Sequence, residues 1–343
     1  MPTQHKVLFL TERSARHQKD ALASAPTDLD IIMLRQPSHA EILQQISACE
    51  FLITERAGVI DTTMLAAAPS LRLVQRLGSL TYDIDIVAAR QADIPVCAWP
   101  IRGCILVAEH MLMQMLALVK HLPEVSAIAN AAADWDRAAR RTDENTFAYN
   151  WSKRTGIAGI YEKTVGILGF GEIGAELARR ISGFRPQQVL YHKRHQLPAT
   201  VEHELGLIYT SQAQLIAQSD FLCSLLPFYP ETELMLNAAV FASMKQGAFI
   251  VHCGSGSVID EAALANALRS GQLAGAALDT YEWEPLRPDN PLLPLARNPE
   301  MNVLLTPHTA AGASVPGTAK RSDEYENIRR RLNGEPLLYQ VTP

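Results

Sequence analysis

A glycine-rich segment near the middle of the chain has the spacing of a phosphate-binding turn. Gly169, Gly171 and Gly174 follow an apolar run at 165–168 and precede a segment of helical periodicity at 175–181. In such a turn the first glycine permits a tight bend, the second lets the backbone approach a pyrophosphate, and the third lets helix and strand pack closely. The helix N-terminus adds free N–H groups and a positive dipole. The residues predicted to contact a dinucleotide here are Gly169, Phe170, Gly171, Glu172, Ile173 and Gly174.

A basic segment about twenty residues after the glycines bears on the choice of dinucleotide. His192, Lys193 and Arg194 follow a strand predicted at 188–191, and the range 177–201 contains no Asp or Glu. An NAD site usually has a carboxylate near this position to accept hydrogen bonds from the ribose hydroxyls, whereas an arginine can pair with a 2′-phosphate. The sequence therefore predicts NADP(H) in preference to NAD(H). The alternative is a solvated basic loop without a role in binding.

Short apolar runs alternate with segments of helical periodicity along the chain, which predicts βαβ units and parallel sheets. One series precedes the glycine motif and a second contains it, so we expect an α/β fold with two doubly wound parallel sheets. The polar stretch 138–154 between the two series predicts a surface excursion. Strands are predicted at 7–10, 31–34, 51–54, 71–77 and 94–97, then at 165–168, 188–191, 221–225, 248–251, 274–278 and 303–305, with helical segments that include 40–49, 175–181 and 260–270.

Composition and charge narrow the class of protein. The chain has 343 residues, of which 48% are hydrophobic and 20% charged, so it can bury a large core. A soluble globular protein with two domains is expected. Lys and Arg number 31 against 36 Asp and Glu, a formal charge of −5. Because nucleic-acid binding depends on clustered cations that neutralise phosphates, we expect no nucleic-acid partner and favour small-molecule chemistry.

Cysteine content and apolar segments predict the compartment. The five cysteines are odd in number and lack metal-ligand spacing, so neither a disulfide framework nor a metal site is expected. The apolar stretch near the N-terminus is too short for a signal peptide. The most apolar stretch, 104–119, is interrupted by Glu109, His110 and Gln114, so a membrane span is not expected either. These features predict a cytoplasmic protein without a membrane partner.

Further segments, taken in chain order, resemble signatures of the D-isomer-specific 2-hydroxyacid dehydrogenase family. They are Gly78-Ser79-Leu80-Thr81-Tyr82-Asp83-Ile84-Asp85, Val107-Ala108-Glu109-His110, Leu226-Pro227 with Pro230-Glu231-Thr232, Leu278-Asp279-Thr280-Tyr281-Glu282-Trp283-Glu284-Pro285 and Thr306-Pro307-His308. The resemblance covers nearly the whole chain. It is nearest to the glyoxylate/hydroxypyruvate reductases, because their NADP-accepting forms also have a basic loop after the second strand.

The resemblance implies a discontinuous architecture. A flavodoxin-like substrate-binding domain would comprise 1–105 and 306–343, and a Rossmann cofactor domain, 106–305, would be inserted between its two parts. The active site would lie in the cleft between the domains. The family is commonly dimeric through a long helix, for which 107–120 is the matching segment, so a homodimer is expected. An apolar helix of this kind is also typical of a buried core.

The resemblance also implies roles for individual residues. His308 matches the acid/base histidine that gives a proton to the substrate oxygen as hydride arrives from the nicotinamide. Glu284 matches the carboxylate that hydrogen-bonds this histidine and stabilises its protonated form. The backbone of Gly78, Ser79 and Leu80 would bind the substrate. The cofactor-binding residues implied beyond the glycine turn are His192, Lys193, Arg194, Leu226, Pro227, Thr232, Cys253, Asp279 (near the nicotinamide) and His308.

One member of the family's catalytic set is replaced. The family has an Asn-x-x-Arg-Gly stretch after the strand predicted at 248–251, and this chain has His252 and Ser255 at the positions of the asparagine and the arginine. Loss of one preorganised donor at such a site costs about 10²–10³ in rate. Three interpretations are open: another cation, Arg56 or Arg102, takes the role; the substrate lacks the usual carboxylate; or the protein binds its cofactor with little turnover.

Two functions follow from these patterns. The first is an NAD(P)H-dependent oxidoreductase that transfers hydride between nicotinamide and a small 2-hydroxy acid, 2-oxo acid or related carbonyl. The second is a nicotinamide-binding regulatory protein with degenerate catalysis, similar to the dehydrogenase-related corepressors. The retained pair of His308 and Glu284 favours the enzyme, because a non-enzyme has no chemical need for both. His252 and Ser255 favour the regulator.

Overall fold

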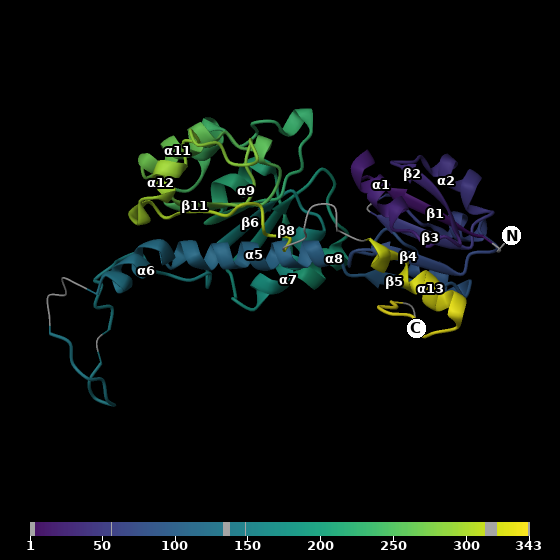
Figure 1. The fold of residues 1–343 in the computed structure, drawn as a ribbon, viewed down its shortest axis with the longest axis horizontal. Coiled ribbons are helices and arrows are strands. Elements are labelled where there is room, and N and C mark those ends of the chain that lie inside the picture. The colour runs from purple at the N-terminus through teal and green to yellow at the C-terminus, as the bar shows by residue number, and fades with distance from the viewer. Residues whose placement is uncertain (1–3, 56, 133–137, 148, 313–320, 342–343) are drawn as a thin grey trace. The chain divides into compact units, whose positions relative to one another are not determined.

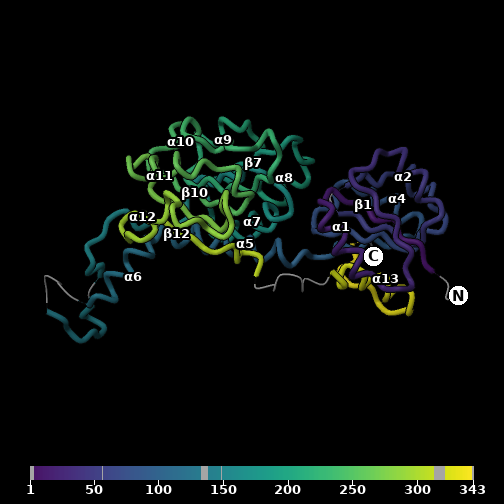
Figure 2. The backbone as a smooth tube through the Cα atoms, turned by 45° about the horizontal axis from the view of Figure 1, so that its top comes forward, coloured from purple at the N-terminus to yellow at the C-terminus, as the bar shows by residue number. Residues whose placement is uncertain are grey.

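Two parallel β-sheets organise the fold, each in its own compact unit (Figures 1 and 2). The computed structural model describes residues 4–55, 57–132, 138–147, 149–312 and 321–341. One unit comprises Met1–Arg102 and Ala313–Pro343, and the other is Gly103–Gly312. The second division falls later in the chain than the 305/306 boundary that the resemblance implied. His308 therefore belongs to the unit that carries the glycine motif, and not to the returning segment of the first unit.

The first unit contains a five-stranded parallel sheet in the order β2-β1-β3-β4-β5. This is the strand order of a flavodoxin-like doubly wound sheet, in which crossover helices cover both faces. Both faces of the inner strands are buried, and all five residues of β3 and of β4 are buried. The elements are β1 (His5–Thr11), α1 (Ala15–Ala23), β2 (Leu29–Arg35), α2 (His39–Ile46), β3 (Phe51–Glu55), α3 (Thr62–Ala66), β4 (Leu73–Leu77), α4 (Ile86–Gln91), β5 (Val96–Trp99) and α13 (Glu326–Asn333).

Side-chain caps fix where several helices of the first unit begin. Ser38 accepts a hydrogen bond from the N–H of Glu41 at the start of α2, and Asp61 caps α3 in the same way. Asp85 accepts from the N–H of Ala88 and caps α4. Such caps each contribute about 1 kcal/mol. Because Asp85 closes the segment that begins at Gly78, its cap also fixes one end of the predicted substrate loop.

The second unit contains a seven-stranded parallel sheet in the order β12-β11-β10-β9-β6-β7-β8. The order runs outward from β6 in both directions, as in a Rossmann-type doubly wound sheet. Its elements are α5 (Arg102–Val119), α6 (Leu122–Ala131), β6 (Thr164–Leu168), α7 (Glu172–Ser182), β7 (Gln188–His192), α8 (Ala199–Leu205), β8 (Leu207–Tyr209), α9 (Gln212–Gln218), β9 (Phe221–Ser224), α10 (Ala238–Ser243), β10 (Ala248–His252), α11 (Glu261–Arg269), β11 (Leu273–Leu278), α12 (Leu293–Ala296) and β12 (Val303–Leu305).

The predicted α/β fold with two parallel sheets is confirmed, and each strand predicted from the sequence is present. The sequence did not indicate β8. This edge strand has three residues, of which only Leu207 is buried, so it lacks the apolar run that marked the others.

Helices α5 and α6 follow one another along one side of the second unit (Figures 1 and 2). By length and composition alone, α5 is apolar enough to cross a membrane, but half of it is buried inside the fold. Its buried residues include Met111, Gln114 and Met115. Beyond α6 the described part of the polar stretch 138–154 is mostly exposed, and it extends away from the sheet in Figure 1. The predicted surface excursion is confirmed.

Candidate active site

The glycine motif forms the turn between β6 and α7. Gly169 has a φ of +87°, and a Cβ added there would lie 2.8 Å from the backbone nitrogen of Leu226. A Cβ at Gly171 would meet nothing within 4 Å, so the backbone there is open to a ligand. At Gly174 a Cβ would come within 3.0 Å of the Phe170 ring, so the third glycine makes room for a side chain of the turn itself. An open backbone at a helix N-terminus fits a dinucleotide pyrophosphate.

The side chains at this turn differ in how they lie. Glu172, in the first turn of α7, is buried, and Ile173 is partly buried. A carboxylate in the first turn of a helix is stabilised by the helix dipole. The contacts available to a dinucleotide here are therefore mainly those of the backbone around Gly171.

The basic segment at the end of β7 divides into structural and exposed residues. His192 Nδ1 hydrogen-bonds the carbonyl oxygen of Thr210 at 2.8 Å, and its ring stacks on Tyr209. Lys193 is half-buried. Arg194 is exposed, and its guanidinium carbon lies 5.5 Å from the centre of the Tyr229 ring, which follows β9. A cation over an aromatic face is held in place without losing its charge. Arg194 is therefore an exposed cation held beside an aromatic ring, and its role toward a ligand phosphate stays a prediction.

The loop after β9 contacts both the glycine turn and the segment after β10. The carbonyl oxygen of Leu226 accepts a hydrogen bond from the N–H of Ser255 at 2.9 Å, and a Cβ at Gly254 would lie 2.6 Å from the same oxygen. The Thr232 hydroxyl lies 2.8 Å from the carbonyl oxygen of Pro227 and so closes the loop on itself. The need for glycine at position 254 was not recognised in the sequence.

His308 and Glu284, which lie on separate loops, form a hydrogen-bonded pair. His308 Nδ1 is 2.7 Å from Glu284 Oε2, and Glu284 Oε1 accepts from the N–H of Tyr281 at 3.1 Å. Because Glu284 is an acceptor, Nδ1 carries the proton of this bond, and Nε2 is left as the nitrogen for proton transfer. The His308 side chain is 57% exposed, so this nitrogen is accessible. The bracing N–H of Tyr281 was not predicted.

Asp279 is buried at the end of β11 and holds the turn that carries His308. Its Oδ1 accepts from the hydroxyl of Thr306 at 2.6 Å and from the N–H of Thr309 at 3.0 Å. Its Oδ2 accepts from the N–H of Ala310 at 2.8 Å. The resemblance had placed Asp279 near the nicotinamide. The described hydrogen bonds show that this carboxylate organises residues on both sides of His308. Its place near the nicotinamide stays a prediction.

The segment after β10 contains Ser255, the residue that the resemblance places at the position of the family arginine. A Cβ at Gly256 would overlap the backbone of Tyr281, so only glycine fits there. Ser255 directly precedes this close contact between the two backbones. Ser255 is half-exposed. Burial of His252 lowers its pKa to about 4, and its Nε2 lies 3.0 Å from the carbonyl oxygen of Ser255. His252 is therefore neutral near pH 7 and donates this bond, so it supplies no positive charge.

Two buried polar atoms beside this segment have no hydrogen-bond partner among the described residues. They are Nδ1 of His252 and the hydroxyl oxygen of Ser224, and these two residues pair in register on neighbouring strands. Cys253 is also largely enclosed, with its Sγ 3.5 Å from Gln114 Oε1, and burial raises the pKa of its thiol. A thiol with a raised pKa is a poor nucleophile at neutral pH.

The predicted substrate loop belongs to the first unit and follows β4. Gly78 has a φ of +119°, and its N–H donates to the carbonyl oxygen of Trp99 at 2.8 Å. Beneath the loop, the buried Arg76 forms an ion pair with Asp83 and donates to the Thr54 hydroxyl at 2.9 Å. Ser79 and Leu80 are half-buried. The loop is thus held at both ends.

Of the two arginines considered as substitutes for the family arginine, the structure describes only Arg102. Arg102 is exposed at the start of α5. Arg56 lies outside the described residues. In the described part of the chain, no group of three or more His, Cys, Asp or Glu is arranged to hold a metal ion.

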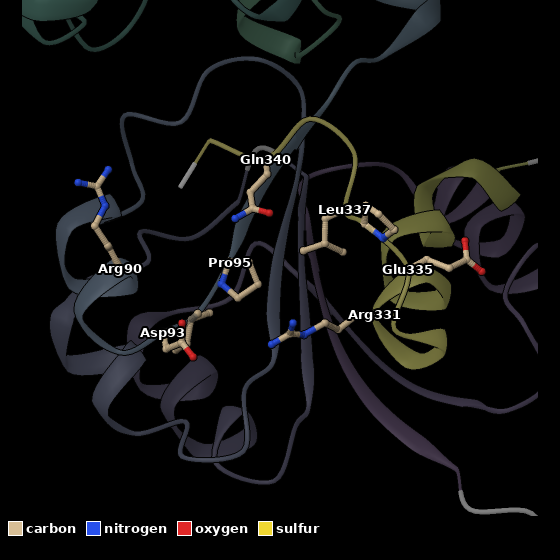
Figure 3. Close-up of a pocket in the computed structure, with 9 residues that line it drawn as sticks. Arg90, Asp93, Pro95, Arg331, Glu335, Leu337 and Gln340 are labelled. Atoms are coloured by element: carbon tan, nitrogen blue, oxygen red, sulfur yellow. The ribbon is translucent and has the colours of Figure 1, made fainter. Parts of the chain in front are cut away.

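A cavity of about 400 Å³ lies elsewhere in the first unit (Figure 3). Its walls include Arg90, Asp93, Pro95 and Arg331, and Figure 3 shows Arg331 extending from α13 toward Asp93. Pro95 precedes β5, so the cavity lies at the N-terminal end of that strand, whereas Gly78 follows the C-terminal end of β4. Its described lining includes none of the predicted site residues.

The sheet of the second unit and its glycine turn define a nicotinamide-dinucleotide-binding domain of Rossmann type. Residues 112–310 match the family model described as D-isomer specific 2-hydroxyacid dehydrogenase, NAD binding domain. The chain belongs to the D-isomer-specific 2-hydroxyacid dehydrogenases, a family of NAD-binding oxidoreductases.

Two enzymes are similar to this chain in sequence over most of its length. A glyoxylate reductase of Korarchaeum cryptofilum is 32% identical over 300 residues, which cover 87% of this chain and 84% of that protein. A D-3-phosphoglycerate dehydrogenase of Mycobacterium leprae is 30% identical over 329 residues, which cover 96% of this chain but 57% of that protein. The chain thus spans little more than half the length of the phosphoglycerate dehydrogenases that it matches.

A solved structure shares the fold. The glyoxylate reductase from Paecilomyes thermophila is 28% identical, covers 99% of both chains and superposes with a TM-score of 0.53.

Proposed function

We propose that the protein is a reductase of small 2-oxo acids or related carbonyls that uses a nicotinamide dinucleotide and prefers NADPH to NADH. The observation that carries this proposal is the hydrogen bond between His308 and Glu284. A carboxylate on Nδ1 stabilises the imidazolium and fixes the ring, so that Nε2–H can give its proton to a carbonyl oxygen. The similarity to glyoxylate reductases over most of their length supports a small 2-oxo acid as substrate.

The chain's own residues provide the dinucleotide site. The backbone at Gly171 and the N-terminus of α7 would hold the pyrophosphate, and Arg194 would pair with the 2′-phosphate of NADPH. When bound, the dinucleotide supplies the hydride that adds to the carbonyl carbon. His308 supplies the proton that the oxygen gains, and Glu284 stabilises the protonated histidine before that transfer.

The replacement of the family arginine by Ser255 bears on substrate choice. Ser255 has no positive charge, and the neighbouring His252 is neutral, so a substrate carboxylate must find another cation. Arg56 and Arg102 are the proposed substitutes. If neither serves, carbonyls without a carboxylate are the better substrates. Alanine variants at both positions, measured for KM with a 2-oxo acid, test this point: unchanged KM values in both would remove the substitutes.

We also propose a cytoplasmic homodimer. The free cysteines among the described residues suit a reducing compartment. On α5 and the chain that follows, Met113, Leu122, Phe147 and Tyr149 are large apolar side chains that are 46–82% exposed. Exposed apolar residues on one connected segment favour an interface. Sedimentation equilibrium tests it, and a monomer at micromolar concentration would rule the dimer out.

A regulatory nicotinamide-binding protein is the second candidate, and Ser255 favours it. Initial rates of NADPH and NADH oxidation with glyoxylate, hydroxypyruvate, pyruvate and uncharged aldehydes separate the two. We expect turnover with at least one carbonyl, faster with NADPH, and its loss in His308→Ala. Binding of the dinucleotide without turnover above the His308→Ala variant would favour the regulator.

A further inference from the structure

The motif Val107-Ala108-Glu109-His110 contributes to none of the contacts discussed so far, although Val107 and Ala108 are buried in the second unit. His110 is on α5, and its side chain is 14% exposed. Its Nε2 lies 3.1 Å from the hydroxyl oxygen of Thr306 and 3.7 Å from Asp279 Oδ1. Thr306 is 196 residues away in the chain and stands just before the turn that carries His308.

The distances fix the direction of the hydrogen bonds. The Thr306 hydroxyl has one proton, and its short contact of 2.6 Å to Asp279 Oδ1 shows that this proton is donated to the carboxylate. The hydroxyl oxygen is then an acceptor, so His110 must donate to it from a protonated Nε2. Gln114 Nε2, at 3.5 Å, is a longer second donor to the same oxygen. A hydrogen-bond network thus leads from His110 and Gln114 on α5 to the Thr306 hydroxyl, and from that hydroxyl to the Asp279 carboxylate.

At the Asp279 end of this hydrogen-bond network, the carboxylate binds the backbone of the turn that carries His308. Asp279 accepts the N–H groups of Thr309 and Ala310, which directly follow His308. His308 itself has a φ of +53°, in the left-handed region that residues with a side chain adopt uncommonly. The turn is therefore anchored on both sides of a residue in a strained backbone conformation.

We infer that His110 is a positioning residue for His308. Through Thr306 and Asp279 it ties α5 to the turn and holds the backbone conformation that brings His308 Nδ1 to Glu284. His110 does not touch substrate or cofactor in this role. The inference deepens the proposed function and rests on it for its catalytic consequence, but the anchoring itself is a property of the folded chain and is testable without turnover.

Two matched pairs of variants test the catalytic consequence. Thr306→Val keeps the shape of the side chain without its hydroxyl, and Thr306→Ser keeps the hydroxyl. His110→Leu removes the donor, and His110→Gln places an amide N–H at similar reach. We expect Thr306→Val and His110→Leu to lower kcat by about 10²-fold, because a small misplacement of a catalytic group has that effect, with the dissociation constant of NADPH unchanged. Thr306→Ser and His110→Gln should recover most of the rate.

A double variant separates positioning from a general defect. In a His308→Ala background, His110→Leu should lower the residual rate no further, because its effect passes through His308. A further loss in that background, or a parallel loss of NADPH affinity, would overturn the inference.

The third readout uses the protein without substrate. In NMR spectra of ¹⁵N-histidine-labelled protein, the His308 Nδ1–H bonded to Glu284 should give a downfield proton signal, assigned by its absence in His308→Ala. We expect this signal to vanish in His110→Leu and persist in His110→Gln. Its persistence in His110→Leu would contradict the positioning role. If the wild type shows no turnover, loss of the signal in His110→Leu but not in His110→Gln would still support the anchoring. In that case the proposed reductase function would be wrong and the anchoring right.

Discussion

The turn that carries His308 and the segment after β10 that contains Ser255 lie in the same unit, yet they are built differently. In the first, two carboxylates hold His308 and its turn: Asp279 accepts three donors, and Glu284 accepts two. In the second, Nδ1 of His252 lacks a partner among the described residues. The pair predicted to transfer the proton, His308 and Glu284, is thus held together, whereas the segment that the resemblance assigns to the substrate anion has no cation at Ser255 or His252. The proposed function attributes this contrast to a change of substrate rather than a loss of chemistry.

The largest expected effect concerns the intact turn. His308→Ala and Glu284→Gln remove the proton donor and its partner, and we expect kcat to fall by about 10²–10⁴-fold for the first, since general acid catalysis contributes that much. Glu284→Gln should fall less, because the amide still accepts from Nδ1. Steady-state rates with saturating NADPH measure both, and equal rates in wild type and His308→Ala would show that the contrast is without functional meaning.

The altered segment offers a gain-of-function test. Ser255→Arg restores the guanidinium of the family, and we expect it to raise kcat/KM for glyoxylate relative to an uncharged aldehyde by about 10²-fold, the usual effect of one preorganised donor. Ser255→Gln, which adds length without charge, is the control and should leave the ratio unchanged. An unchanged ratio in Ser255→Arg would mean that another cation already binds the carboxylate.

His252 makes stability depend on pH. Burial lowers its pKa from 6.5 to about 4, so the folded state binds fewer protons than the unfolded chain between these values. The contribution of His252 to the free energy of unfolding is therefore greatest above pH 6.5. It declines as the pH falls to about 4, by about 3 kcal/mol at most. Urea unfolding at pH 7.5 and 4.5 should show a smaller loss in His252→Asn than in wild type.

The exposed histidine at position 203 gives the control for that measurement. His203→Asn should leave the pH dependence as in wild type, and an equal change in both variants would exclude His252 as its source.

The smallest effect concerns the dinucleotide. Arg194→Gln should weaken NADPH binding by about 1.5–3 kcal/mol, the contribution of a hydrogen bond to a charged group, and leave NADH binding unchanged. Fluorescence titration with both dinucleotides measures the difference. Equal affinities for NADPH and NADH in the wild type would refute the predicted preference.

The sequence predicted local features well. The apolar runs indicated the strands, because parallel strands are buried on both faces, and the glycine turn was recognisable because its residues are contiguous. The pairing of His308 with Glu284 came from family resemblance alone, since it depends on two loops that meet only in the fold. The contact between His110 and Thr306 was beyond prediction from one sequence, as neither residue's neighbours indicate a partner 196 positions away.

The most direct test of the central claim follows the hydride. Protein, glyoxylate and NADPH deuterated at both C4 positions are incubated together, and the product acid is examined by mass spectrometry, with uncharged aldehydes in parallel. We predict a product with one carbon-bound deuterium from the wild type, and a rate of its formation at least about 10²-fold lower from His308→Ala. The absence of a deuterated product from every carbonyl tested, with NADPH bound, would contradict the assignment of the protein as a reductase.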